Sequence, residues 1–297
     1  MSFTNQITEE LLRLPLKKTC CRKALALGMT AAARRGKDGW TLYLYDPQVA
    51  ELSRSLLERI FHAGVGLTET LRAGRITQVV TWRSAAVTAF LEALDEKKAP
   101  SVAEAAGFRC PLCEAHFVRG VILTSATVTD PTKGYHMELT LPEEGRADAL
   151  SELLAGAVGA PTRVKRGDRF GLCYKRNGAI SDLLYFAGCS KTSFDVTNAS
   201  IEREIRNNEN RATNCVARNI ARSVGASQRH RDAIERLTAT RVIDTLPEEL
   251  RLTAALRMEH PDASLTELAL MHEPPLTKSG LNRRLQRLLE IAEEGEN

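Results

Sequence analysis

Hydrophobic and polar positions before residue 190 follow helical and strand periodicities in an order that occurs twice. In the first half the pattern predicts helices at 20–35, 48–62 and 84–97 and strands at 40–46, 65–72 and 76–82. In the second half it predicts helices at 111–125, 146–158 and 179–187 and strands at 135–141, 162–166 and 169–175. Each half therefore has the order helix, strand, helix, strand, strand, helix, which indicates an α+β structural duplication without sequence repetition.

The helix that opens each half is unusually rich in small and apolar residues. Gly28 lies in the first of these helices and Gly120 in the second. Because glycine has no Cβ, two helices that meet at glycines can bring their backbones close together. We therefore expect these two helices to pack on each other and to join the halves.

The C-terminal part of the chain carries the pattern of three further helices. Thr245 and Glu248 have the spacing of a capping box, which predicts a helix that continues until a proline ends it. Ser264 and Glu267 form a second such pair and open a short helix at 265–271. A short helix, a tight break and a longer helix are typical of a helix-turn-helix, although this turn contains two prolines and no glycine.

The third of these helices, which Thr277 is placed to cap, has two different faces. Its apolar stripe consists of Leu281, Leu285, Leu288 and Ile291. Its opposite face carries Lys278, Ser279, Asn282, Arg283, Gln286 and Arg287. Amide and guanidinium groups make bidentate contacts with adenine and guanine edges, and the major groove admits a helix. These six residues are therefore predicted to bind DNA; the alternative is a solvated face on a small helical bundle.

Residues 201–230 are predicted to form a linker helix rich in arginine and asparagine. Asparagine is a poor helix former, so its density here is unusual for a helix that only needs to be soluble. Arginine reaches phosphate oxygens and asparagine reaches base edges. The candidates for nucleic-acid contact are Arg206, Asn210, Arg211 and Asn214. The alternative is a solvated linker.

The composition of the 297-residue chain is consistent with these predictions but does not by itself establish a function. The length accommodates two domains, and a net charge of +4 does not by itself indicate a nucleic-acid partner. The charge is local, since residues 203–241 hold 9 arginines and 4 acidic residues. No secretory signal and no apolar run of membrane-spanning length occur, so we expect a cytoplasmic, nucleoid-associated protein with reduced cysteines.

Several stretches match the pattern of a known family. The N-terminal matches are Leu14-Pro-Leu-Lys-Lys-Thr-Cys-Cys-Arg22 and Phe117-Val-Arg-Gly-Val-Ile-Leu123. The later matches are Ala179-Ile-Ser-Asp182, Glu204-Ile-Arg-Asn-Asn-Glu-Asn-Arg211, Asn214-Cys215, Leu256-Arg-Met-Glu-His-Pro261 and Pro274-Pro-Leu-Thr-Lys-Ser-Gly-Leu-Asn-Arg-Arg-Leu285. On these residues the whole chain resembles the WhiA family, bacterial regulators of sporulation and cell division.

This resemblance implies a domain order and a function. It implies two pseudo-symmetric halves like a LAGLIDADG homing endonuclease at 1–200, divided near residue 100, and an all-α helix-turn-helix domain at 231–297. The latter is expected to be similar to region 4 of sigma factors, with the linker helix at 201–230 between the domains. The implied function is regulation of transcription through binding of double-stranded promoter DNA.

The endonuclease chemistry of the resembled fold can be tested at two positions. LAGLIDADG nucleases hold a divalent metal through one acid at the eighth position of each motif helix, because hard cations prefer carboxylate oxygen. In this chain those positions are Ala33 and Ser125. Neither side chain replaces a carboxylate, so we expect no catalytic residue, no catalytic metal and no cofactor.

Four cysteines have a spacing that permits two interpretations. Cys110 and Cys113 have metal-ligand spacing, and Cys20 and Cys21 precede the other motif helix, so the four thiols could converge on one zinc. Against this, no second CxxC exists and adjacent cysteines are poor tetrahedral ligands. The sequence therefore favours small buried hydrophobic residues over a metal site.

The sequence as a whole predicts a sequence-specific DNA-binding regulator without catalysis or a membrane anchor. RNA polymerase or a partner regulator is a candidate protein partner. Two alternatives remain, an active LAGLIDADG-type endonuclease and a protein-interaction adaptor of the transcription machinery. A cleavage assay with magnesium distinguishes the regulator from an active endonuclease. A footprint on genomic DNA distinguishes the regulator from a protein-interaction adaptor.

Overall fold

A computed structural model describes residues 2–294 and divides into two compact units. The first unit extends to Glu204 and the second begins at Ile205. The last three residues of the expected 231–297 domain lie outside the described part of the chain. Each unit is described by itself.

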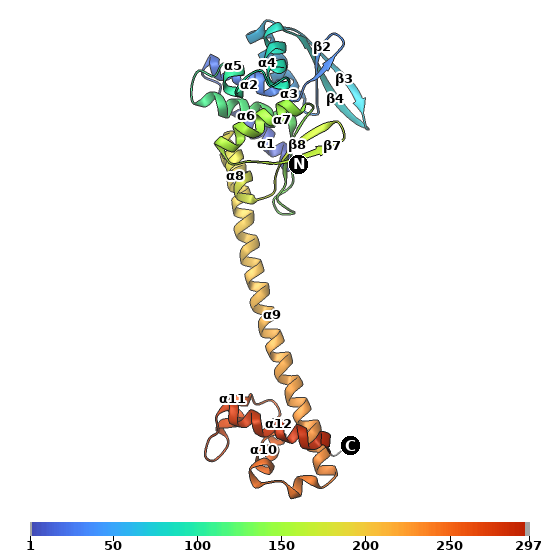
Figure 1. Ribbon diagram of the computed structural model, residues 1–297, viewed down its shortest axis with the longest axis vertical. Coiled ribbons are helices and arrows are strands. Elements are labelled where there is room, and N and C mark those ends of the chain that lie inside the picture. Colours follow the sequence, from blue (N-terminus) through green and yellow to red (C-terminus); the bar gives the residue numbers. More distant parts are fainter. Residues whose placement is uncertain (1, 295–297) are drawn as a thin grey trace. The chain divides into compact units, whose positions relative to one another are not determined.

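The first half of unit 1 forms one antiparallel sheet with helices packed on it (Figure 1). Its elements are α1 (Phe3–Arg13), α2 (Thr19–Thr30), β1 (Arg34–Gly36), β2 (Gly39–Leu44), α3 (Pro47–Phe61), β3 (Gly64–Arg72), β4 (Arg75–Arg83), α4 (Ala85–Asp95) and α5 (Val102–Ala106). The strand order is β1-β2-β4-β3. Trp40, Leu42 and Leu44 of β2 are buried while intervening residues are less so, which is the alternation of a sheet with one covered face.

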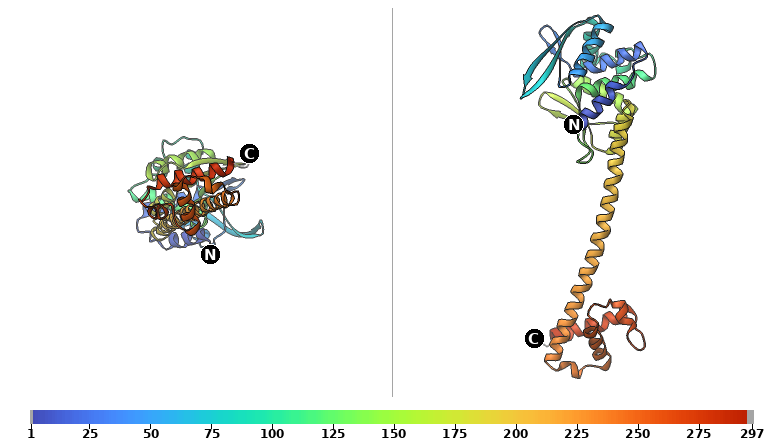
Figure 2. Two further views of the ribbon diagram at one scale, coloured as in Figure 1. Left: turned by 90° about the horizontal axis from the view of Figure 1, so that it is seen from below. Right: turned by 180° about the vertical axis from the view of Figure 1, so that it is seen from behind.

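The second half of unit 1 repeats this arrangement. Its elements are α6 (Leu112–Ser125), β5 (Ala126–Val128), β6 (Met137–Leu141), α7 (Glu144–Ala157), β7 (Thr162–Arg166), β8 (Arg169–Tyr174) and α8 (Asn177–Phe186). The strand order β5-β6-β8-β7 corresponds strand for strand to that of the first sheet, which confirms the predicted duplication. Figure 1 and the rear view in Figure 2 show the helices of unit 1 gathered on one side of the two sheets.

The motif helices α2 and α6 form the most extensive helix contact in the molecule, as the sequence predicts. A Cβ built on Gly28 would overlap the carbonyl oxygen of Phe117, and one built on Gly120 would overlap that of Leu25. The two backbones therefore touch where each helix has a glycine. The expected helix at 20–35 ends early, at Thr30, because the chain turns there and Arg34 begins to pair with β2.

A buried ion pair also joins the halves. The guanidinium of Arg146 in α7 donates to both carboxylate oxygens of Asp95 in α4, at 2.6 and 2.8 Å. It also donates to the carbonyl oxygens of Ala31 and Ala33, which follow the end of α2. Arg146 is 2% exposed, and these bonds satisfy a charge that would otherwise be costly to bury.

The long helix α9 (Ser190–Ala239) begins in unit 1 and ends in unit 2. Both carboxylate oxygens of Glu10 in α1 accept hydrogen bonds at its first turn, from the backbone of Lys191 and from the backbone and hydroxyl of Thr192. A carboxylate at a helix N-terminus suits the helix macrodipole. The expected linker at 201–230 lies wholly inside α9, whose side chains are exposed on all sides between 204 and 225.

Unit 2 consists of the end of α9, a short 3-10 turn η1 (Val242–Thr245), α10 (Glu248–Glu259), α11 (Leu265–Leu270) and α12 (Lys278–Glu294). Ser264 and Glu267 form the predicted capping box at α11. The capping box expected at Thr245 and Glu248 is wrong. The Thr245 hydroxyl instead donates to the carbonyl of Val242 in the 3-10 turn, and α10 starts after Pro247 without a side-chain cap.

The core of unit 2 is built on the leucine stripe of α12. Leu281, Leu285 and Leu288 are buried against α10 and α11, and Ala292 continues the stripe where Ile291 was expected. Ala233, Ile234 and Leu237 from the end of α9 complete the core. Among the described residues, no helix is both long enough and apolar enough to cross a membrane.

Candidate nucleic-acid interface

The outward face of α12 carries all six side chains that the sequence predicts for it. Burial of the leucine stripe turns the opposite face outward, and every one of the six is exposed: Lys278, Ser279, Asn282, Arg283, Gln286 and Arg287. Thr277 accepts a hydrogen bond from the backbone of Gly280 and caps the helix as expected. The result is a rigid helix with a face of amide, hydroxyl and cationic groups.

The arginines of α12 differ in how far their charge is already neutralised. Arg287 lies 3.1 Å from Glu290 and 3.8 Å from Glu294, and Arg284 lies 2.9 Å from Glu249 of α10. Within the described residues Arg283 has no ion-pair partner. Among the arginines of this helix, Arg283 is therefore the one whose charge is free to bind an external anion or base edge.

The turn between α11 and α12 is held by a buried histidine that the sequence analysis did not single out. His272 is 2% exposed, and its Nε2 lies 3.0 Å from the hydroxyl of Thr253 in α10. Its Nδ1 lies 3.0 Å from the carbonyl oxygen of Leu268 in α11. The imidazole thus ties both helices together and fixes the approach to α12 in a turn that lacks glycine.

A buried arginine holds the preceding turn in the same way. Arg257 of α10 donates at 2.8 Å to the carbonyl oxygen of Ala263, just before α11. Desolvation by burial lowers the pKa of Arg257. Burial, followed by the nearby charge of Arg257, lowers the pKa of His230 to about 4, so this histidine is neutral near neutral pH.

The four candidates on α9 are also exposed. Arg206, Asn210 and Asn214 follow one another at intervals of four residues and form one ridge, with Arg211 beside it. Arg203, one turn earlier, is different. Its guanidinium donates to the carbonyl oxygens of Pro131 and Thr132 and stacks over Tyr135, so it is engaged within unit 1.

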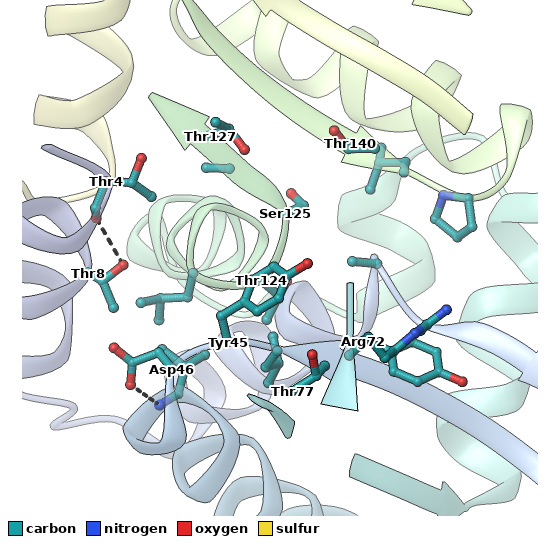
Figure 3. Close-up of a pocket in the computed structure, with 18 of the residues that line it drawn as sticks. Thr4, Thr8, Tyr45, Asp46, Arg72, Thr77, Thr124, Ser125, Thr127 and Thr140 are labelled. Carbon is teal, nitrogen blue, oxygen red and sulfur yellow. Dashed lines mark hydrogen bonds between the residues drawn. The ribbon is translucent and has the colours of Figure 1, made fainter. Parts of the chain in front are cut away.

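A cavity of about 600 Å³ lies at the C-terminal ends of α2 and α6, where the resembled nucleases carry their acids. Figure 3 shows that hydroxyl side chains from several elements surround it, among them Thr4, Thr8, Thr77, Thr124, Ser125, Thr127 and Thr140. The hydroxyl of Ser125 donates to the carbonyl of Val121, and Ala33 is buried. Neither position offers a carboxylate oxygen.

Among the described residues that line this cavity, Asp46 carries the one carboxylate. It is the N-cap of α3 and accepts hydrogen bonds from the backbones of Gln48 and Val49. Arg34, Arg72 and Arg169 line the same cavity. A single capping carboxylate among three guanidinium groups is a poor site for a hard divalent cation, which prefers several oxygen ligands.

At the opposite ends of α2 and α6 the structure brings four cysteines together. The sulfur of Cys110 lies 3.7 Å from that of Cys20 and 3.6 Å from those of Cys21 and Cys113. All four sulfurs lie within 4.8 Å of one another. The sequence allowed this convergence but favoured four buried hydrophobic residues over a metal site; Cys20 and Cys21 both lie in the first turn of α2, next to the start of α6.

Two family models match consecutive parts of the chain. The model of the WhiA LAGLIDADG-like domain matches residues 114–206. The model of the WhiA C-terminal HTH domain matches residues 210–292. Together the matched segments contain most of the second motif helix α6, helices α10 and α11, and nearly all of α12.

Curated relatives match over almost the full chain. "Probable cell division protein WhiA" from Moorella thermoacetica is 31% identical over 300 residues, which cover 99% of this chain and 92% of the relative. The protein of the same name from Syntrophomonas wolfei is 28% identical over 311 residues, covering 99% and 98%.

Two solved structures share the fold. Full-length DUF199/WhiA from Thermatoga maritima has a TM-score of 0.59 and 22% identity, with 99% of each chain covered. The N-terminal LAGLIDADG domain of DUF199/WhiA has a TM-score of 0.50 and 17% identity, covering 64% of this chain and 94% of that one. Both likenesses concern the fold alone.

Proposed function

This chain belongs to the WhiA family, and from that premise we propose that it is a sequence-specific DNA-binding regulator without nuclease activity. In this proposal α12 is the helix that enters the major groove. Its specificity comes from base-edge contacts by Asn282, Arg283 and Gln286, and Lys278, Ser279 and Arg287 contact the backbone at the sides.

The observation that carries the proposal is the exposed polar face of α12 on a fixed scaffold. Leu281, Leu285 and Leu288 anchor the opposite face, so the orientation of the helix does not depend on the DNA. Asn282 and Arg283 lie on one turn of this face and Gln286 lies one turn further on, so amide and guanidinium groups are presented together to a groove that admits a helix. The free guanidinium of Arg283 is suited to the two acceptors of a guanine edge.

The polar ridge of α9 supports a second, sequence-independent contact. Arg206, Asn210, Arg211 and Asn214 are exposed, and none of them is needed for either core. Phosphate contacts of this kind add affinity to every DNA sequence and position the protein on the duplex. We propose that this ridge binds the backbone.

We propose that the chain is not a nuclease because of the residues at the ends of its two motif helices, α2 and α6. Metal-assisted strand cleavage requires carboxylates that hold the cation next to the scissile phosphate. Ala33 and Ser125 occupy the two acid positions, and Asp46 is committed to capping α3. The arginine-lined cavity is compatible with passive contact with phosphate, not with its hydrolysis.

The names of the relatives suggest where such a regulator acts. They are called probable cell division proteins, and we propose that this chain controls genes of cell division and sporulation. RNA polymerase or another regulator bound at the same promoter is the proposed protein partner. An HTH domain that contacts DNA at a promoter is well placed to meet either one.

The direct experiment is a selection of genomic DNA fragments by the purified full-length chain, followed by sequencing and footprinting of the retained fragments. The proposal expects a small set of fragments that share a short motif protected by the protein. Retention of fragments in proportion to their length alone would contradict sequence-specific binding. No retention of DNA, together with binding to RNA polymerase, would favour the adaptor alternative.

A further inference from the structure

We propose that Cys20, Cys21, Cys110 and Cys113 bind one structural zinc ion that joins the two halves of unit 1. The first pair belongs to the start of α2 and the second pair to the start of α6. The cluster therefore bridges residues about 90 positions apart in sequence, across the contact between the motif helices.

The distances suit tetrahedral coordination. Zinc–thiolate bonds are about 2.3 Å long, which places the sulfurs of a tetrahedral site about 3.8 Å apart. The three measured separations from the Cys110 sulfur are 3.6, 3.6 and 3.7 Å, and all four sulfurs lie within 4.8 Å of one another. The separations thus lie close to the tetrahedral value, with an upper bound about 1 Å above it.

The position at two helix ends explains how adjacent cysteines serve as ligands. In the middle of a helix, consecutive side chains diverge by about 100° and could not share one ion. Cys20 and Cys21 instead lie in the first turn of α2, and Cys110 and Cys113 flank the start of α6. Side chains at the open end of a helix can turn beyond it, and here they meet the facing helix.

The electrostatics of the two helix ends favour the same ion. Four thiolates around one zinc ion carry a net charge of −2, which needs nearby positive potential. The N-termini of α2 and α6 both point at the cluster, and neither is capped by a side chain. The positive macrodipole ends of the two helices stabilise anions.

The site would be structural rather than catalytic. Four protein ligands leave no open position for water or substrate. Cys21 and Cys113 are buried, and the cluster lies at the opposite ends of α2 and α6 from the cavity with the former acid positions. Zinc would hold the two motif helices in register, and this role does not depend on DNA binding or cleavage.

The first experiment measures the metal content of the full-length chain after purification under reducing conditions. We expect about one zinc per chain by elemental mass spectrometry, as for a single closed site. After chelation, addition of Co²⁺ should produce a thiolate-to-cobalt charge-transfer band and the intense visible bands of a tetrahedral cobalt site. Removal of the metal should lower the melting temperature of unit 1. The unfolding of this unit can be monitored by the fluorescence of Trp40 and Trp82.

Matched variants assign the metal to the cluster. Cys113→Ser and the less buried Cys20→Ser should each lose zinc and the cobalt bands. Cys189→Ser, a buried cysteine elsewhere, and Cys215→Ser, an exposed one, should keep both. If Cys113→Ser fails to fold, the Cys20→Ser variant and the metal content of the unmodified chain still decide the question.

Three results would overturn the proposal. The reduced, folded chain could contain no metal and give no cobalt–thiolate bands. The freshly purified chain could contain a disulfide between two of the four cysteines. Finally, zinc could persist in both cluster variants but be lost in His136→Gln, which would place it at His136, Glu138 and Cys173, the other ligand group among the described residues.

Discussion

At the scale of single residues, unit 2 depends on three polar side chains buried among its helices. His272, in the turn after α11, hydrogen-bonds to α10 and α11, Arg257 hydrogen-bonds to the turn before α11, and His230 lies near the charge of Arg257. Each is less than a tenth exposed. Buried polar groups without alternative partners make the position of α12 sensitive to small changes.

The buried His230 predicts a pH dependence of stability. Burial and the charges of Arg257 and Arg229 lower its pKa in the folded chain to about 4, against 6.5 for an ordinary histidine. The unfolded chain therefore binds the proton more tightly than the folded one. Stability from this group is complete above pH 6.5 and is lost as the pH falls from there towards 4.

The measurement is the thermal unfolding of the full chain, followed by far-ultraviolet circular dichroism at several pH values. The transition of unit 2 should move to lower temperature between pH 6.5 and 5, while the variant His230→Gln should show a smaller change over the same range. Equal pH dependence in both proteins would mean that His230 is not responsible.

The exposed Arg211 on α9 predicts a different kind of effect. If the α9 ridge contacts phosphates, Arg211→Ala should weaken binding to all duplexes by a similar factor. It should also reduce the slope of log affinity against log salt by about one unit. A titration of specific and scrambled duplexes across several salt concentrations checks this. Loss of affinity for the specific duplex alone would instead assign Arg211 to base reading.

At the scale of elements, the contact of α2 with α6 determines the geometry of unit 1. Gly28 and Gly120 each lie against the backbone of the facing helix, with no room for a Cβ. Gly156 in α7 has nothing within 4 Å of the position that a Cβ would occupy. Substitution by alanine is therefore expected to destabilise the protein at Gly28 or Gly120 and to stabilise it at Gly156.

Gly28→Ala should destabilise the chain by about 1–3 kcal/mol, because the added methyl group would push α2 away from the carbonyl of Phe117. Gly156→Ala should stabilise it by about 0.5–1 kcal/mol, because alanine is the better helix former and meets no neighbour. Urea unfolding followed by tryptophan fluorescence measures both. A neutral Gly28→Ala would show that the helices are not in close contact in solution.

Much of the element order could be predicted from the sequence, and the failures have physical causes. The bounds of α6 are predicted nearly to the residue from a long apolar run, and the start of α12 from its cap and its leucine stripe. The strands β1 and β5 were missed, since three residues carry no measurable periodicity. The extension of α9 back to Ser190 was missed because its cap, Glu10, lies far away in sequence.

The candidate site also has parts that could be predicted from the sequence and parts that could not. The outward face of α12 follows from its leucine stripe and could be predicted residue by residue. The roles of His272 and Arg257 could not be predicted, because a single buried polar residue leaves no periodic pattern in the sequence. The convergence of the four cysteines depends on the long-range pairing of α2 with α6, which no local spacing reveals.

At the scale of the whole molecule, the chain combines a LAGLIDADG-like unit with a C-terminal HTH domain. The α+β unit retains the duplicated sheets and the paired motif helices of the LAGLIDADG fold. Alanine and serine occupy its acid positions, and arginines line its cavity. Such a scaffold can contribute contact with DNA without contributing hydrolysis.

This arrangement predicts that the full chain does not cleave DNA. Supercoiled plasmid and selected target duplexes should remain intact after incubation with the protein and magnesium or manganese. The described residues that line the cavity include one carboxylate, Asp46, and not the pair that would hold the metal. The assay is gel electrophoresis of the products over a range of protein concentrations. Nicking that survives repurification, scales with the protein and disappears in Asp46→Asn would contradict the prediction.

The central claim, that α12 reads DNA, is tested most directly by one set of titrations. The wild-type chain, Arg283→Ala and Arg284→Ala are titrated at one salt concentration with the selected duplex and with single-base variants of it. Arg284 is the matched control, since it lies next to Arg283 but is committed to Glu249. The account predicts that Arg283→Ala loses about 1–3 kcal/mol of binding free energy and its preference at one base pair, while Arg284→Ala keeps that preference. A folded Arg283→Ala protein with unchanged affinity and base preference would contradict it.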